Sequence, residues 1–338
     1  MRHRLERLRE RTNDYTVAPD QYAIVTYVAL GALTLIVMTG AAVRLTGSGL
    51  GCPTWPKCYG HVYPPLNTHA VIEFSNRVIT FPVSIAAGAA WLLAIRRRPY
   101  RRDLVWLGAL LPIGVVGQAV LGGFTVKGAL DYGWVMGHFA LSMLILAAAV
   151  VLAWRATYEP ERPEDLVSTP DRTLVWWVRG LTALGALTIF AGTAATAAGP
   201  HAGGSPGQKI NRLDFDGAGT MNFVIHRHAE IAFVFSLVAV AIWWLARRRS
   251  ADPRLQRSLT VLCVLLALQG AVGLDQYETH LPAELVWVHV GLACATWLAA
   301  LWAACAAGPL KERESQISAE RPLGGQLRAP TPVKFPGN

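Results

Sequence analysis

Eight long apolar segments limit the folds that are open to this 338-residue chain. Crossing the hydrocarbon core of a bilayer takes about 20 mostly apolar residues in a helix. Because 53% of the residues are hydrophobic and only 16% are charged, a soluble globule could not cover its apolar surface. The sequence therefore predicts an all-α membrane protein of eight transmembrane helices. The segments are 22–43, 69–95, 104–124, 132–154, 174–198, 219–246, 256–275 and 282–306.

Clusters of arginine predict how these helices are oriented. Arginine-rich sequence precedes the first segment, follows the second at 96–102 and follows the sixth at 247–249. Loops with an excess of Lys and Arg stay in the cytoplasm, so we expect both termini there and the alternate loops outside the cell, in the plasma membrane. The net charge of +9 comes from such clusters, and we expect no nucleic-acid partner. The expected outer loops are 44–68, 125–131, 199–218 and 276–281.

The two halves of the chain repeat one another. Gly-Ala-Leu-Thr occurs at 31–34 and again at 185–188, in the first helix of each half. Four helices in each half bring both halves into the membrane in the same direction, so we expect a parallel repeat of two four-helix bundles. The other matching pairs are Asn76-Arg77 with His226-Arg227, Gln118 with Gln269, Gly122 with Gly273, and His138 with His289.

This repeat predicts five parts along the chain. Residues 1–21 form a cytoplasmic tail, 22–154 the first half, 155–173 a cytoplasmic linker and 174–306 the second half. The last part, 307–338, is a cytoplasmic tail rich in Pro, Arg and Gly without apolar periodicity, which we expect to be disordered.

Three histidines and one asparagine lie at one expected depth. Asn76, His138, His226 and His289 each lie about seven residues from the outer end of a predicted helix, roughly 10 Å at 1.5 Å per residue. Two axial imidazoles on one heme need two histidines that face each other across a bundle. The pair His226 and His289 meets this requirement, whereas zinc would need three or four ligands close together. A hydrogen bond between helices is the alternative for each histidine.

The first half differs at one position. His138 is the counterpart of His289, but Asn76 stands where the second half has His226, and an amide is a poor iron ligand. A heme in this half would be five-coordinate or would take another ligand. Glu73 lies one turn from Asn76 and is costly inside a membrane, so we expect it either to transfer protons or to pair with Arg77.

Other polar residues near the outer surface have two interpretations each. Arg44, Arg77 and Arg227 are suited to bind heme propionates, because Arg bonds carboxylates bidentately. The alternative is that their side chains extend to the membrane surface and bind lipid phosphate. His69 is either a substitute iron ligand or an interfacial polar residue. His228 lies two residues beyond His226, on another face, and is expected to be structural.

The first outer loop contains the closely spaced Cys52 and Cys58. On the oxidising side of the membrane we expect them to form a disulfide. It is either a structural clip or a thiol pair that exchanges electrons. The density of Gly and Pro favours fixed turns, and we expect the loop to cover the first half.

These residues resemble the heme A synthase family, membrane enzymes that convert heme O to heme A for cytochrome oxidases. The resemblance spans about 22–306 and is carried by the loop from Arg44 through Cys52-Pro53, Trp55-Pro56 and Cys58, by Ile72-Glu73 with Arg77, and by His138, His226-Arg227 and His289. Many members have His where Asn76 stands, which favours His138 as the single first-half ligand.

The resemblance implies an oxidoreductase with heme b on His226 and His289, and with heme O as substrate in the first half. A methyl group there would be oxidised to a formyl group with Glu73 and His138 close to the reaction. Expected partners are the lipid bilayer, a heme O synthase and an electron donor that the sequence does not identify. The sequence does not decide whether the protein forms an oligomer. The alternatives are a b-type cytochrome that only transfers electrons, a thiol oxidoreductase that uses Cys52 and Cys58, and a transporter.

Overall fold

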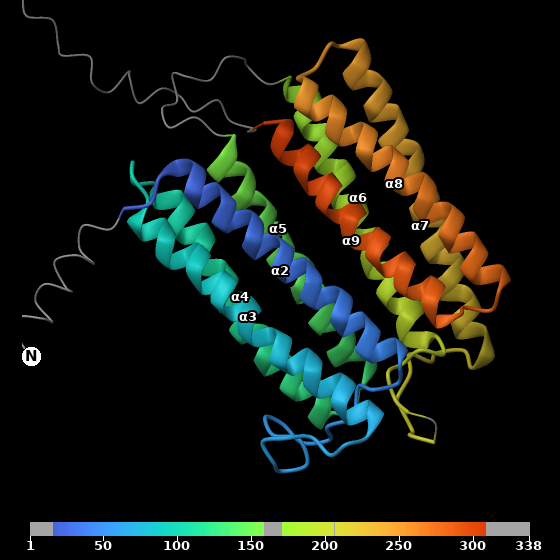
Figure 1. The fold of residues 1–338 in the computed structure, drawn as a ribbon. Helices are drawn as coiled ribbons and strands as arrows, with labels where there is room; N and C mark the ends of the chain where they lie inside the picture. Colours follow the sequence, from blue (N-terminus) through green and yellow to red (C-terminus); the bar gives the residue numbers. More distant parts are fainter. Residues whose placement is uncertain (1–15, 159–170, 206, 309–338) are drawn as a thin grey trace, which may run out of the picture.

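The computed structural model describes residues 16–158, 171–205 and 207–308 (Figure 1). Within these residues, eight helices are long and apolar enough to cross a membrane, as predicted. Seven predicted segments lie inside their helices; the eighth starts one residue early, because Pro282 has extended backbone and precedes the helix. With the labels of Figure 1, the helices are α2 (Pro19–Leu45), α3 (Thr68–Arg96), α4 (Arg102–Lys127), α5 (Tyr132–Thr157), α6 (Arg172–Ala198), α7 (Ala218–Arg248), α8 (Pro253–Glu278) and α9 (Ala283–Ala306).

Polar side chains mark where several helices begin. Asn67, Asp131, Asp171 and Asp252 each accept a hydrogen bond from a backbone N–H in the first turn of the following helix. Such caps satisfy donors that have no partner inside the helix. The predicted linker 155–173 is shorter than expected, because α5 continues to Thr157 and α6 starts at Arg172; residues 159–170 and most of both predicted tails lie outside the described residues.

The helices pack as two groups of four. In each group, neighbours along the chain pack together and the first helix also packs on the last: α2 on α5, and α6 on α9 (Figure 1). The groups meet where α9 packs on α2 and α5 and where α5 packs on α6. Inside this junction the indole N–H of Trp297 on α9 donates to the carbonyl of Met143 on α5 at 3.0 Å.

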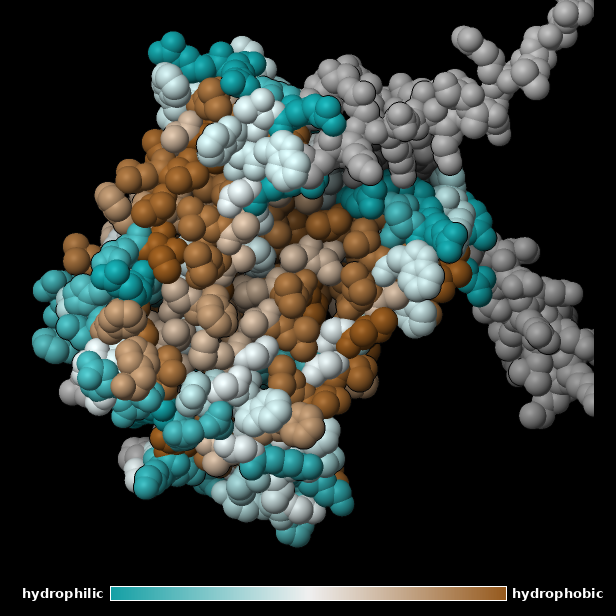
Figure 2. Space-filling view, turned by 180° about the vertical axis from the view of Figure 1, so that it is seen from behind, coloured by the Kyte–Doolittle hydropathy of each residue, from teal (hydrophilic) through white to brown (hydrophobic). Residues whose placement is uncertain are grey.

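The outer surface of the helices is apolar over their middle portions. Phe81, Leu144, Trp106 and Ile24 are 70%, 66%, 64% and 64% exposed. Figure 2 shows apolar side chains over the middle of the molecule and hydrophilic ones towards its ends. A soluble monomer rarely exposes so much contiguous apolar surface, so this is a multi-pass membrane protein.

Four connections meet at one end of the molecule, which we call the loop end: 46–67, 128–131, 199–217 and 279–282 (Figure 1). The N–H of Gly49 donates to the Gly203 carbonyl at 2.8 Å, and the Ser205 hydroxyl donates to the Gly47 carbonyl at 2.8 Å. Gly47 has a φ of +65°, and a Cβ there would lie 2.8 Å from the Gly204 oxygen. The loops of the two groups are therefore bonded to each other.

Candidate functional site

His138 and His289 occupy matching positions in the two groups of helices. Each is the seventh residue of its helix, on α5 and α9 respectively. Each ring lies against a glycine of the preceding helix: a Cβ on Gly122 would be 3.3 Å from His138 Cε1, and a Cβ on Gly273 would be 3.2 Å from His289 Cε1. The repeated glycines thus leave room for the two imidazoles.

A glutamine accompanies each of these histidines. Gln118 Nε2 donates to the His138 carbonyl at 2.9 Å and to Ser142 Oγ at 2.7 Å. Gln269 Nε2 donates to the His289 carbonyl at 3.1 Å and lies 3.2 Å from His289 Nε2. The glutamine therefore holds the backbone in both halves and also reaches the ring in the second.

The ring nitrogens indicate what these positions can bind. Nδ1 of His138 and Nδ1 of His289 are buried without a hydrogen-bond partner in the described part of the chain. A buried polar atom without a partner costs about 1–3 kcal/mol. Neutral imidazoles inside an apolar bundle are ligands that suit heme iron, so the residues fit a heme in each half.

The two histidines of α7 lie on different faces, as predicted. His226 is exposed; its Nδ1–H donates to the Asn222 carbonyl of its own helix at 2.7 Å, and its ring centre lies 6.3 Å from that of Tyr277 on α8. His228 is half-buried, and its ring centre lies 6.3 Å from that of His289. The interior face of α7 is therefore the face that carries His228.

Asn76 lies towards the first helix of its own group. Its Oδ1 accepts a hydrogen bond from the Thr39 hydroxyl on α2 at 2.7 Å. Sequence reasoning missed Thr39, because helical threonines commonly bond their own backbone, as Thr39 also does to Ile36. The contact fixes the Asn76 amide and leaves its NH2 group as a donor.

Glu73 and Arg77 bind the first outer loop. Glu73 is only 6% exposed, and its carboxylate accepts from the Cys52 N–H at 2.6 Å and from Arg77 Nη2 at 2.5 Å. Arg77 in turn donates to the carbonyls of Cys52 at 2.9 Å, Thr54 at 3.0 Å and Pro56 at 3.3 Å. The pairing of Glu73 with Arg77, one of the two roles expected from the sequence, is thus present, and it anchors the loop to α3.

The other predicted arginine and histidine positions contact protein groups. Arg44 Nη1 donates to the carbonyl of His201, in the loop of the second group, at 2.7 Å. Arg227 pairs with Glu230 at 2.5 Å on the exposed side of α7. His69 Nδ1 lies 3.0 Å from the Ser48 hydroxyl. Arg44 thus joins the two groups of helices at the loop end.

Cys52 and Cys58 form the predicted disulfide, and both are fully buried. The loop packs over the ends of α3 and α4, since a Cβ on Gly123 would lie 3.1 Å from the Trp55 ring. It therefore covers the first group of helices, on the same side as Glu73.

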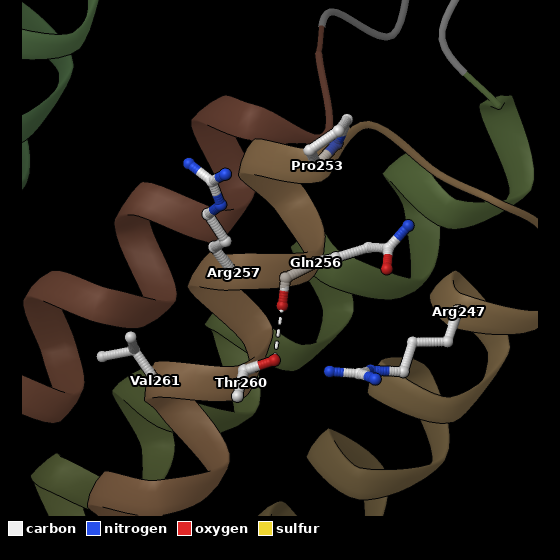
Figure 3. Close-up of a pocket in the computed structure, with 6 residues that line it drawn as sticks. All are labelled: Arg247, Pro253, Gln256, Arg257, Thr260 and Val261. Carbon is white, nitrogen blue, oxygen red and sulfur yellow. Dashed lines mark hydrogen bonds between the residues drawn. The ribbon is translucent and has the colours of Figure 1, made fainter.

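A surface pocket of about 550 Å³ lies away from all these residues, where α7 ends and α8 begins (Figure 3). Figure 3 shows Arg247 and Gln256 beside it, with Thr260 donating to the Gln256 carbonyl at 2.8 Å. It contains none of the histidines and lies at the end opposite to the loop end.

A family model for cytochrome oxidase assembly proteins matches residues 23–301. A heme A synthase of Shewanella oneidensis is 27% identical over 303 residues, which cover 76% of this chain and 88% of that protein. A heme A synthase of Lysinibacillus sphaericus is 31% identical over 168 residues, and there the match spans about half of each protein, 47% of this chain and 53% of the relative.

A third relative combines a similar region with additional sequence. The protoheme IX farnesyltransferase of Thermus thermophilus is 28% identical over 280 residues, which cover 78% of this chain but only 45% of that protein. All three alignments are with bacterial proteins.

Proposed function

The chain belongs to the cytochrome oxidase assembly protein family, and we propose that it is a heme A synthase, an oxidoreductase that converts heme O to heme A. The observation that carries this proposal is the pair of matching interior histidines, His138 and His289, each with its glutamine and glycine. An electron-transferring cytochrome would need saturated iron in both halves, and Asn76 in the first half speaks against that.

We infer that the halves are parallel repeats in the plasma membrane with both termini in the cytoplasm. The arginine clusters at the ends of α3 and α7 support this topology, because Lys- and Arg-rich loops stay inside. The loop end then faces outwards, where the Cys52–Cys58 disulfide persists.

The first half is proposed to take the substrate, heme O. Its reaction replaces a methyl group by a formyl group, which removes four electrons and four protons, adds the oxygen of one water equivalent and requires an external oxidant to take up the four electrons. His138 is the proposed iron ligand, and Asn76, whose Oδ1 accepts from Thr39, offers an amide N–H in the same half. Glu73 is the proposed proton acceptor beneath the loop, where its carboxylate lies against Arg77.

The second half is proposed to hold heme b between His289 and a histidine of α7. Heme b in this position would pass single electrons. His226 was predicted from the sequence as the second ligand and stays a prediction. Arg44, Arg77 and Arg227 are the proposed partners of heme propionates, and each would have to rearrange from the contacts it makes with His201, Glu73 and Glu230.

The proposal predicts the hemes that the protein carries. Purified protein co-expressed with a heme O synthase, the class of enzyme that must supply its substrate, should yield heme b together with heme O or heme A on extraction. Glu73→Gln should keep heme b but form no heme A, whereas Glu278→Gln, which changes an exposed carboxylate at the end of α8, should form heme A normally. Two equivalents of heme b and no heme O or A would instead identify an electron-transferring cytochrome.

A further inference from the structure

The pocket of about 550 Å³ at the end opposite to the loop end takes no part in the proposed heme chemistry. It lies between the last turns of α7 and the first turns of α8 (Figure 3). Pockets of about 300–1,000 Å³ are the usual size for small-molecule sites. Its walls include Arg247 from α7 and Arg257 from α8, and none of the six described residues that line it is acidic.

One wall of the pocket is held by a chain of contacts. The guanidinium of Arg247 lies over the Trp243 ring, with its central carbon 4.6 Å from the ring centre. The indole N–H of Trp243 donates to Thr260 Oγ1 at 2.9 Å, and the Thr260 hydroxyl donates to the Gln256 carbonyl at 2.8 Å. Stacking uses the face of a guanidinium and leaves the N–H groups in its plane free to bind an anion. Arg247 is therefore positioned as a donor beside the pocket.

The charges of the two pocket arginines are not neutralised by the protein. Arg247 and Arg257 are exposed, and neither forms an ion pair within the described part of the chain. The nearby Arg249, by contrast, pairs with Asp171 at 2.8 Å. A guanidinium binds phosphate oxygens bidentately, so two arginines without acidic partners suit a phosphate group.

An apolar stripe on α8 leads away from the pocket. Val261 lines the pocket and is 52% exposed, and Val264 and Leu268 follow it with 56% and 49% exposure. Spacings of three and four residues place all three on one face of the helix. In a multi-pass membrane protein such a face lies against lipid chains. A phosphate site at the end of an apolar stripe matches the layout of a phospholipid, whereas a soluble anion would use only the arginines.

The position of the pocket along the helices also fits a lipid headgroup. Trp243 and Trp244 lie just before the arginines that end α7, and tryptophans are enriched at the boundary between lipid chains and water. In the proposed topology this end faces the cytoplasm. The cytoplasmic leaflet carries anionic lipids, and basic pockets between helices on that side bind their headgroups.

We propose that this pocket binds one anionic phospholipid. Arg247 and Arg257 hold its phosphate, and an acyl chain lies along Val261, Val264 and Leu268. The lipid joins the ends of α7 and α8. The proposal involves none of the histidines, so it stands or falls independently of the proposed heme A synthesis.

Native mass spectrometry of the full chain, stripped of lipid in detergent, tests the pocket with added phosphatidylglycerol. The parent should bind one equivalent at least tenfold more tightly than phosphatidylcholine, whose choline neutralises the phosphate. The double variant Arg247→Gln with Arg257→Gln should lose at least tenfold in affinity for phosphatidylglycerol. The matched control is Arg98→Gln with Arg102→Gln, which removes two exposed arginines at the same end of the first group and should stay within twofold of the parent. An equal loss in both double variants, or no loss in the pocket variant, would overturn the proposal.

Two further measurements cover the other occupants and an unfolded variant. Excess inorganic phosphate should displace phosphatidylglycerol no better than sodium chloride of equal ionic strength; stronger displacement would assign the pocket to a soluble anion and refute the lipid. Phosphatidylglycerol should raise the melting temperature of the parent and of the control, because a ligand of the folded state stabilises it, but not that of the pocket variant.

If the glutamine variant does not fold, Arg247→Lys with Arg257→Lys keeps both charges without the bidentate donors. It should bind phosphatidylglycerol several-fold more weakly than the parent, and parental affinity would count against the assigned phosphate site.

Discussion

Glu73→Gln should release the first outer loop without unfolding the protein. The Glu73 carboxylate joins the Cys52 N–H and Arg77, which holds three loop carbonyls. The glutamine side chain can still accept one of these two hydrogen bonds through its neutral amide oxygen. Its NH2 group then faces the donor of the second bond and cannot accept it. Loss of one charge-assisted bond costs about 1.5–3 kcal/mol, which raises the population of the open loop about 10- to 150-fold.

The rate at which a water-soluble phosphine reduces the Cys52–Cys58 disulfide measures this opening. Both cysteines are fully buried, so the reagent reaches them only when the loop opens. Reduction should be about 10- to 150-fold faster in Glu73→Gln, and trapping the thiols with a maleimide of known mass counts the reduced protein. Glu278→Gln, a matched change on the exposed surface, should react at the parental rate. Rates within twofold of the parent in both variants would refute the idea that Glu73 holds the loop.

Three further changes test the packing. Gly51→Ala should also speed reduction of the disulfide, because its Cβ would lie 2.2 Å from the carbonyl oxygen of His69; a parental rate would contradict this close approach. Trp297→Phe should lower the melting temperature by loss of a buried hydrogen bond across the two groups, worth about 1–2 kcal/mol, and an unchanged melting temperature would count against it. Arg249 and two backbone N–H bonds hold the pKa of Asp171 below its usual range, so its stabilisation is present at neutral pH and is lost as pH falls through that lowered pKa. Asp171→Ala should therefore cost about 1 kcal/mol at pH 7 and progressively less in acid, as measured by melting at both pH values; an equal cost at both would disprove the linkage.

The sequence alone determined the eight helices, because the length of an apolar run is enough to identify a membrane span. It also determined the disulfide, since Cys52 and Cys58 are close in the chain, and the positions of Gln118 and His138 with their second-half counterparts, because these keep one register over two adjacent helices. These features depend on local composition and spacing, which the sequence contains directly.

Which face of each helix points inwards depends on how the helices pack in three dimensions. A membrane helix is apolar all round, so no amphipathic pattern marks its packed side, and the sequence could not show that His228 contacts the Thr188 carbonyl of α6. The contacts of Arg44 with His201 and of Asn76 with Thr39 likewise join residues far apart in the chain. Such contacts depend on how the helices pack and how the loops meet, and the spacing of residues along the chain does not contain that information.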